Sequence, residues 1–505
     1  MTFIPSIVNW FTAKRLNQID LFRRNPVESQ ENILLYLISK ARGTEWGNKF
    51  GYENIKSIND FQKNVPLQTY ENLIPYINRL KKGEKDLLWP GSIKWFAKSS
   101  GTTSCKSKFI PISNEALQHC HYRGARDILA LYTAQIPKTG IFNGKGLTLG
   151  GSQKLNNMGT SSVSGDLSAI LINNAPQWIE FIRTPKSDIA LIPDFELKLE
   201  EIARHTIGEN VTSFSGVPSW CLVMIRHILS HTGKSNLHEV WPNLEVFFHG
   251  GINFSPYREQ YRQLLPAGQM NYMESYNASE GYFGIQDDLF SSDMLLMLDY
   301  GIFYEFIPVS EITSDSPPVI TIGEVEKDVN YAIVISTNAG LWRYIIGDTI
   351  IFTNLFPHKF KITGRTKHFI NAFGEEIIID NAEKALESAC SLTGSSISEY
   401  TAGPIYMSSV TKGSHEWIIE FEKEPENIEH FTEILDKALQ SVNSDYEAKR
   451  HKDLTLSMPV VKTVPRGTFY NWFREKNKLG GQHKVPRLSN TREYIDDIYK
   501  FAGIN

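Results

Sequence analysis

The chain carries one Gly-, Ser- and Thr-rich stretch, Lys98-Ser99-Ser100-Gly101-Thr102-Thr103-Ser104-Cys105-Lys106-Ser107-Lys108, between two apolar runs. A glycine among hydroxyl side chains lets backbone N–H groups approach a ligand closely, and the hydroxyls can meet oxygens in several directions. The flanking lysines add positive charge, so the composition is typical of a loop that binds a polyphosphate. The P-loop spacing Gly-x4-Gly-Lys-Ser/Thr is missing, and an ordinary mobile Ser/Thr loop is the alternative interpretation.

Length and composition limit the number of domains and the class of protein to which this stretch can belong. The 505 residues favour about three domains, and 41% hydrophobic with 21% charged residues is ordinary for a globular protein. A net charge of -4 argues against broad nucleic-acid binding, which favours a basic surface. The four cysteines are dispersed and form no metal-ligand or redox pair, which is typical of reduced thiols. Neither a secretory signal nor a membrane-spanning apolar run is evident, so we expect a cytoplasmic protein without a membrane partner.

The first half of the chain changes from helical to alternating patterns. The first ninety residues are mainly helical, and a helix from Asn114 to Thr133, with Ser113 as its N-cap, follows the polar stretch. After Gly144, short apolar runs alternate with helical stretches, which predicts a mainly parallel α/β sheet with ligands beyond the carboxyl ends of its strands. The predicted strands begin at Leu147, Leu167, Val211 and Leu244, and the helical stretches cover 195–205 and 219–229.

The second half predicts antiparallel strands and a final small domain. Closely spaced apolar runs between Met294 and Ile351 favour a separate small antiparallel sheet or barrel. The last section, of about 140 residues, contains predicted helices over 381–390 and 428–439 and strands near 417–422. We therefore expect an α/β fold with a large domain over 1–366 and a smaller mobile α+β domain over 367–505.

Two stretches in the predicted large domain could bind a nucleotide base and its metal. Phe247-Phe248-His249-Gly250-Gly251 ends a strand with a glycine pair, where the backbone can approach a flat ring, although a tight turn is the alternative. Tyr276-Asn277-Ala278-Ser279-Glu280-Gly281 places an aromatic ring four residues before a carboxylate. The ring can stack on a base and the carboxylate can hold magnesium beside phosphates, whereas a polar loop with a solvated Glu280 is the alternative.

Two later stretches add an acidic residue and a lysine. Trp342-Arg343-Tyr344-Ile345-Ile346-Gly347-Asp348 ends in a turn where a carboxylate can accept both ribose hydroxyls, or simply in a strand-ending turn. Gly480-Gly481-Gln482-His483-Lys484-Val485-Pro486-Arg487 places Lys484 in a glycine-led turn, with an ordinary solvated lysine as the alternative.

The order of these stretches resembles the adenylate-forming superfamily of acyl-CoA synthetases, luciferases and peptide-synthetase adenylation domains. The likeness is greatest to the auxin-responsive acyl-acid amido synthetases of plants and their bacterial relatives, and it runs from about Gln30 to the end of the chain. In Gly364-Arg365-Thr366-Lys367, the resemblance implies that Lys367 is the interdomain hinge. The C-terminal Gln-x-Lys-x-Pro-Arg pattern implies that Lys484 is catalytic and meets the acyl carboxylate and the α-phosphate.

The resemblance also implies the nucleotide site. Tyr276 would lie on adenine, Asp348 on ribose and Ser279 near phosphate, while Glu280 would be catalytic and hold Mg2+ beside ATP. The implied nucleotide-binding residues are Ser99, Ser100, Gly101, Thr102, Thr103, Gly250, Gly251, Tyr276, Ser279, Asp348 and Arg365.

The activity implied by the resemblance is that of an ATP-dependent ligase. It would activate a carboxylic acid as acyl-AMP and transfer the acyl group to an amino acid, so its partners would be a small-molecule acyl acid and an amino acid. An acyl-CoA ligase with a thiol acceptor is the alternative, and a non-catalytic nucleotide-binding protein is disfavoured because Glu280, Asp348 and Lys484 are all present. Ile345 replaces an arginine usual in plant members and Phe373-Gly374-Glu375-Glu376 replaces their Glu-Lys pattern, so the acid and the acceptor stay open.

Overall fold

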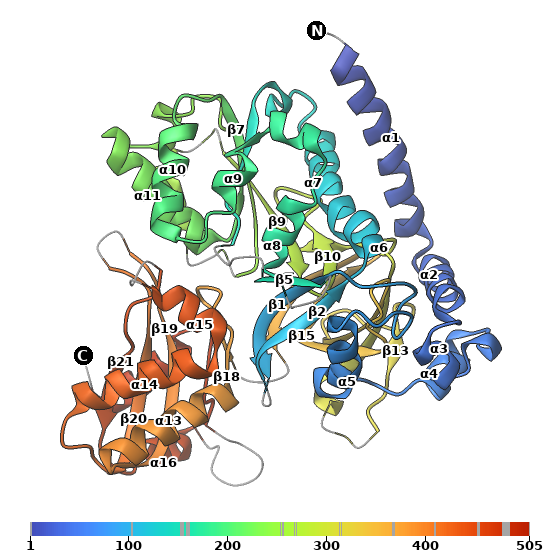
Figure 1. Cartoon of the computed structure of the whole chain (residues 1–505). Helices are drawn as coiled ribbons and strands as arrows, with labels where there is room; N and C mark the ends of the chain where they lie inside the picture. Colours follow the sequence, from blue (N-terminus) through green and yellow to red (C-terminus); the bar gives the residue numbers. More distant parts are fainter. Residues whose placement is uncertain are drawn as a thin grey trace.

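The structure is a computed structural model in which a large N-terminal part surrounds a mixed sheet and a smaller C-terminal part packs on one side of it (Figure 1). The residues that it describes are 3–102, 105–151, 156–157, 162–252, 254, 257–266, 268, 270–312, 314, 316–365, 369–408, 411–451, 455–476 and 485–503. Within these ranges, we find no helix that combines the length and the apolar character needed to cross a bilayer.

The N-terminal helices confirm the predicted helical start. They are α1 (Phe3–Arg24), α2 (Pro26–Ala41), α3 (Glu45–Lys49), α4 (Ile58–Asn64) and α5 (Tyr70–Lys81). Proline at the first position of α2 suits a helix start, and the residues that α2 buries, Leu34, Leu37, Ile38 and Ala41, have the spacing of one helical face. This face packs against β12 (Ile302–Pro308) and β14 (Asn330–Thr337) of the large sheet.

The polar stretch that was predicted as a loop is largely a β-hairpin. β1 (Trp95–Thr102) pairs antiparallel with β2 (Cys105–Ile112), so Ser99, Ser100, Gly101 and Thr102 lie in strand β1. The loop prediction was wrong there because this polar run has no apolar alternation that would indicate a strand. Pairing between the two strands nevertheless satisfies its backbone hydrogen bonds. The hairpin belongs to a small sheet with β5 (Val163–Gly165) and β4 (Asn156–Asn157), and the predicted helix follows as α6 (Asn114–Ala116), a π-helical turn η2 (Leu117–His121) and α7 (Tyr122–Gln135). As predicted, Ser113 caps it, with Oγ accepting from the Ala116 N–H at 2.9 Å.

Among the described residues, twelve strands form one mixed sheet in the order β13-β12-β14-β15-β16-β11-β10-β9-β8-β7-β3-β6. The end from β9 to β6 is parallel, as predicted, and the rest is antiparallel. The prediction of a separate antiparallel sheet was therefore wrong, because a two-residue turn at Ser279-Glu280 joins β9 to β10 and continues the same sheet. The remaining bounds are β3 (Lys145–Thr148), β6 (Arg183–Thr184), β7 (Val211–Gly216), β8 (Val246–Gly250), β9 (Asn271–Ala278), β10 (Gly281–Ile285), β11 (Met294–Leu296), β13 (Ile320–Thr321), β15 (Tyr344–Leu355) and β16 (His358–Arg365).

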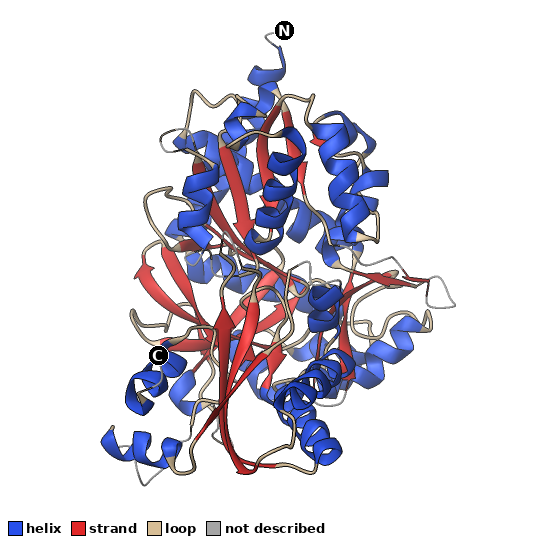
Figure 2. Ribbon diagram, turned by 90° about the vertical axis from the view of Figure 1, so that its left-hand side faces the viewer, coloured by secondary structure: helices blue, strands red, loops and turns tan. Residues whose placement is uncertain are grey.

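Helices cover the parallel half of the sheet, as Figure 2 shows. They are α8 (Leu167–Asn173), α9 (Ser187–Ala190), α10 (Phe195–Thr206), α11 (Pro218–Thr232) and α12 (Arg258–Leu264). The run at Leu167 that was predicted as a strand is helix α8, in which the Ile170 N–H donates to Asp166 O at 3.0 Å. A short apolar run does not distinguish a strand from a buried helix, and here the local i to i−4 bonds satisfy the backbone.

The C-terminal part has its own sheet of three described strands, in the order β19-β20-β21. Its elements are β17 (Phe369–Ile370), β18 (Ile377–Ile378), α13 (Ile379–Thr393), β19 (Ser396–Ile405), β20 (Ser414–Lys423), α14 (Ile428–Val442), α15 (Ser444–Arg450), β21 (Val460–Val464), α16 (Thr468–Glu475) and α17 (Glu493–Ala502). These confirm the predicted helices and strand of this section. The predicted domain limit at 366/367 lies outside the described residues and stays a prediction.

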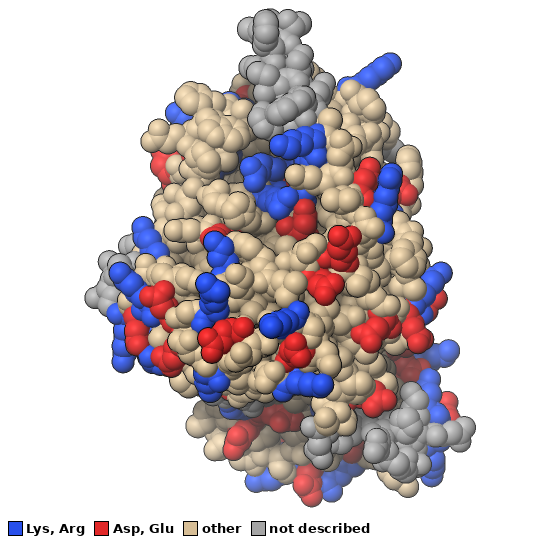
Figure 3. All heavy atoms as spheres, turned by 90° about the vertical axis from the view of Figure 1, so that its right-hand side faces the viewer, with Lys and Arg blue, Asp and Glu red and all other residues tan. Residues whose placement is uncertain are grey.

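The two parts are joined by buried contacts. Tyr257 Oη donates to Ala372 O at 2.6 Å, and Ser107 Oγ of β2 donates to Ser444 Oγ of α15 at 2.9 Å. On the face drawn in Figure 3, basic and acidic side chains are interspersed over the surface.

Candidate active site

A cavity of about 2290 Å³ lies between the β1–β2 hairpin, the carboxyl ends of the parallel strands and the C-terminal part. Ligand sites are expected at this edge of an α/β sheet. Sequence-predicted residues that line the cavity are Ser99, Gly250, Gly251, Tyr276, Ser279, Glu280, Asp348 and Arg365. These residues are up to 266 positions apart in the chain, and the sheet brings them to one place.

The glycine pair at the end of β8 occupies positions that larger residues would not fit. A Cβ on Gly250 would lie 2.2 Å from the backbone oxygen of Ser275 on the neighbouring strand β9. Gly251 has a φ of +85°, in the left-handed region that favours glycine. The pair therefore keeps the backbone of β8 close to β9 and leaves the cavity wall open at this point.

A chain of polar contacts connects three of the predicted residues. Tyr276 donates a short hydrogen bond to Asp348, and Arg365 Nε donates to Asp348 Oδ1 at 2.7 Å. Asp348 and Arg365 are cross-strand partners on β15 and β16, so the pairing of these strands sets their contact. Arg365 also donates to Glu376 Oε1 at 2.9 Å, which extends the chain into the C-terminal section.

Glu280 is held in the cavity by the turn between β9 and β10. Burial raises the pKa of its carboxyl, Lys108 lowers it and Asp348 raises it further. Desolvation and a nearby like charge both disfavour the ionised form, so a bound cation would relieve this cost. Glu280 is therefore a cavity carboxylate that could hold a cation, and its metal role stays a prediction.

Some predicted residues lie outside the described part of the chain. Lys367, Lys484 and Thr103 are not described, and for Ser100, Gly101 and Thr102 only the strand is. The segment that follows Lys484 is anchored to β19, because the Ala402 N–H donates to Arg487 O at 2.9 Å.

Sequence reasoning missed Glu274, which also lines the cavity. It lies on β9 two positions before Tyr276, so the two side chains share one face of the strand. Burial raises the pKa of Glu274 to about 7, so its carboxyl can donate or accept hydrogen bonds near neutral pH. Its partner on β8 is His249, whose ring stacks on Phe254 with centroids 4.2 Å apart and whose pKa burial lowers to about 3. The alternation along the strand before Tyr276 was the signal that could have identified Glu274.

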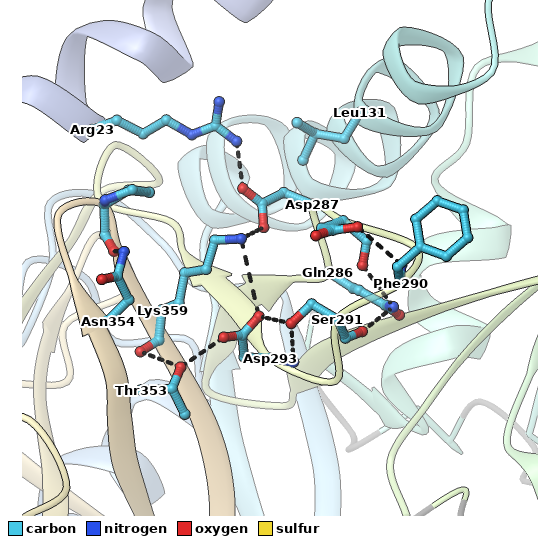
Figure 4. Close-up of polar contacts among 12 residues, drawn as sticks. Arg23, Leu131, Gln286, Asp287, Phe290, Ser291, Asp293, Thr353, Asn354 and Lys359 are labelled. Atoms are coloured by element: carbon cyan, nitrogen blue, oxygen red, sulfur yellow. Dashed lines mark hydrogen bonds and ion pairs between the residues drawn. The ribbon is translucent and has the colours of Figure 1, made fainter.

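One rim of the cavity, residues 286–293, is held by ion pairs from distant parts of the chain (Figure 4). Asp287 contacts Arg23 of α1 at 2.6 Å and Lys359 of β16 at 2.9 Å. Within the rim, Gln286 Nε2 donates to Ser291 O at 2.6 Å. These contacts fix the loop that carries Phe290.

Three exposed aromatic side chains line the cavity. Phe290 is fully exposed, Phe142 and Trp178 are 50% and 58% exposed, and all three line the cavity. Large exposed apolar groups around an opening are typical of a site that admits an apolar ligand.

Comparisons with known proteins identify the family of the chain. Three family models match the chain: the GH3 family N-terminal domain over 15–270, the central domain over 295–365 and the C-terminal domain over 380–493. The indole-3-acetic acid-amido synthetase GH3.3 of Arabidopsis thaliana is 23% identical over 94% of this chain and 91% of its own length.

Two solved structures share the fold. The GH3.15 acyl acid amido synthetase has a TM-score of 0.60 at 18% identity and covers 96% of this chain and 95% of its own. A 2-hydroxyisobutyryl-CoA ligase, solved with its acyl-AMP and CoA in the thioesterification state, has a TM-score of 0.56 at 13% identity, over 94% of this chain and 92% of its own. Since the N-terminal family model alone covers more than half of the chain, the protein belongs to the GH3 family.

Proposed function

We propose that the protein is an ATP-dependent acyl-acid amido synthetase. The observation that carries this proposal is the convergence of Tyr276, Glu280, Asp348 and Arg365 on one cavity in a chain of the GH3 family. The curated relatives support the activity, since they include an indole-3-acetic acid-amido synthetase and a jasmonoyl–L-amino acid synthetase.

In the first step, a carboxylate oxygen would attack the α-phosphorus of ATP and pyrophosphate would leave. Gly250 and Gly251 would border the adenine. Tyr276 would lie against the face of the adenine, and Asp348 would bind the ribose hydroxyls. Mg2+ on Glu280 would neutralise phosphate charge when bound, and Lys484 would offset the repulsion between the carboxylate and the α-phosphate.

In the second step, an amine would attack the acyl carbon and AMP would leave. The domains 1–366 and 367–505, joined at the hinge Lys367, would change position between the two steps. Rotation of this kind would remove Lys484 after adenylation and admit the acceptor.

The exposed aromatic side chains of Phe142, Trp178 and Phe290, which line the cavity, support an acid with an aromatic or aliphatic body. We further propose that the protein works in the cytoplasm on these small molecules, without a nucleic-acid or membrane partner. Its described cysteines, Cys120, Cys221 and Cys390, are free thiols, which suits a reducing compartment.

The test has two parts. ATP–pyrophosphate exchange over a panel of aromatic and aliphatic acids identifies the acid that is adenylated. That acid is then offered with ATP and either amino acids or coenzyme A, and the products are identified by mass. We expect exchange followed by an amide; a thioester with no amide from any amino acid would assign the chain to the acyl-CoA ligases instead.

A further inference from the structure

Helix α15 of the C-terminal part lines the cavity beside the β1–β2 hairpin. Ser444, Asp445 and Lys449 of this helix all line it, and Ser444 is tied to β2 through Ser107. The helix therefore brings charged side chains of the C-terminal part into the site of the large part.

Lys449 is a buried cation without a direct counter-ion. It is 8% exposed, and its Nζ lies 4.0 Å from the centroid of the Trp220 ring. Among the described residues, carboxylates act on its ammonium only through longer-range charge interactions, with no ion pair or side-chain hydrogen bond to it. An ammonium that is removed from water without a paired anion is costly, so an anion that enters the cavity would gain from binding there.

Acidic groups surround Lys449 at longer range. Asp445 of α15, Asp166 before α8, and Glu375 and Glu376 before β18 all act on its charge, and burial is the largest influence, lowering its pKa. Burial raises the pKa of the neighbouring Asp445 to about 7. The several carboxylates around this one cation repel a polyphosphate. The same arrangement suits a ligand that carries one carboxylate and one ammonium group.

We propose that Lys449 and Asp445 bind the acceptor amino acid, with Lys449 on its carboxylate and Asp445 on its amino group. This inference rests on the proposed function and assigns the acceptor site within it. Gly374 supports it sterically: a Cβ there would lie only 3.2 Å from Lys449 Cε, so the glycine leaves room for the lysine stem beside the cavity.

The test compares acceptors with and without a carboxylate. Purified full-length enzyme, with the acid found by pyrophosphate exchange, is offered amino acids, the corresponding amino-acid amides, or hydroxylamine. The variants are Lys449→Met, which removes the charge, Lys449→Arg, which keeps it, and Lys437→Met, a control on an exposed position of α14.

Lys449→Met removes a charge-assisted contact and should therefore raise KM for the amino acid by about ten- to hundredfold. The rate of hydroxamate formation from hydroxylamine should stay within about twofold of wild type. Lys449→Arg should recover most of the loss, Lys437→Met should match wild type, and the preference for an amino acid over its amide should disappear in Lys449→Met only. Equal losses with amino acid and hydroxylamine, or an unchanged KM, would overturn the site assignment while the proposed function stands.

Two outcomes separate the remaining possibilities. If wild type exchanges pyrophosphate but forms no amide from any amino acid, the proposed function fails and the acceptor site fails with it. If Lys449→Met does not fold, Asp445→Asn takes its place, since it should weaken amino acids more than hydroxylamine; no difference between the two acceptors would overturn the proposal.

Discussion

Substitution of Gly250 by alanine tests whether the packing of β8 on β9 positions the nucleotide site. The added Cβ would lie 2.2 Å from Ser275 O, a backbone atom that cannot rotate away. A normal contact needs about 3.4 Å or more, so the strands must separate by roughly 1 Å. Ser275 precedes Tyr276, so this separation moves the predicted adenine partner against the Asp348 carboxylate that it contacts.

A displacement of about 1 Å in a positioning element can lower the rate about hundredfold. We therefore expect Gly250→Ala to reduce ATP–pyrophosphate exchange by about this factor and to raise KM for ATP. The matched control is Gly208→Ala, because a Cβ at Gly208 would meet no atom within 4 Å. Exchange within threefold of wild type, in a Gly250→Ala protein with normal melting, would refute the reasoning that close strand packing sets the site.

Three further predictions use residues of the proposed site or hinge, and a fourth uses a buried ion pair of the large sheet. Lys484→Ala should lower kcat for exchange by about hundredfold or more while ATP binding, measured by calorimetry, is nearly unchanged; near-normal exchange would contradict the assigned role. Lys367→Pro fixes one backbone angle and should impair one half-reaction far more than the other, whereas equal losses in a folded protein would argue against a hinge. Burial raises the pKa of Glu274 to about 7, above its unfolded value, so the folded state binds a proton that the unfolded state has lost. The free energy of unfolding should therefore fall as pH rises from about 4.5 to 7, and urea melts of Glu274→Gln should lack this dependence on pH. Arg343→Met leaves Glu305, which is fully buried and paired with Arg343 at 2.9 Å, without its cationic partner. It should lower the free energy of unfolding by about 3–5 kcal/mol, with Arg466→Met on the surface as the control.

The sequence predicts elements well where apolar spacing is regular. The predicted spans of α10, α11 and α14 agree with the structure to within a few residues, and the first ninety residues are mainly helical as predicted. Prediction from the sequence fails where the apolar residues have no regular spacing. The run at Leu167 is too short to distinguish α8 from a strand, and the hydroxyl-rich run at Ser99 has no apolar alternation to indicate β1.

Register is the second kind of information that the sequence lacks. Tyr276, Asp348 and Arg365 were each identifiable from local motifs, but the contacts among them depend on how β15 pairs with β16 and how the large sheet is ordered. The sequence could not predict the single mixed sheet for the same reason. The two halves are continuous because of the hairpin at Ser279-Glu280, and not because of the composition of either half.

The described residues that local motifs identify, such as Gly250, Tyr276 and Glu280, line the cavity, and contiguous motifs of this kind make the proposed adenylation step easier to predict than the acceptor. A nucleotide binds to backbone turns and short contiguous patterns, such as Gly250-Gly251 or the turn that carries Glu280. Glu274 and Lys449, by contrast, are single charged residues in ordinary stretches, and only burial in the cavity distinguishes them from solvated side chains. Lys449 becomes a candidate binding group because the fold places it over Trp220 and on the wall of the cavity, which no spacing in the sequence encodes. The choice of acceptor therefore depends on tertiary placement, and the comparison of Lys449→Met with Lys449→Arg measures that placement directly.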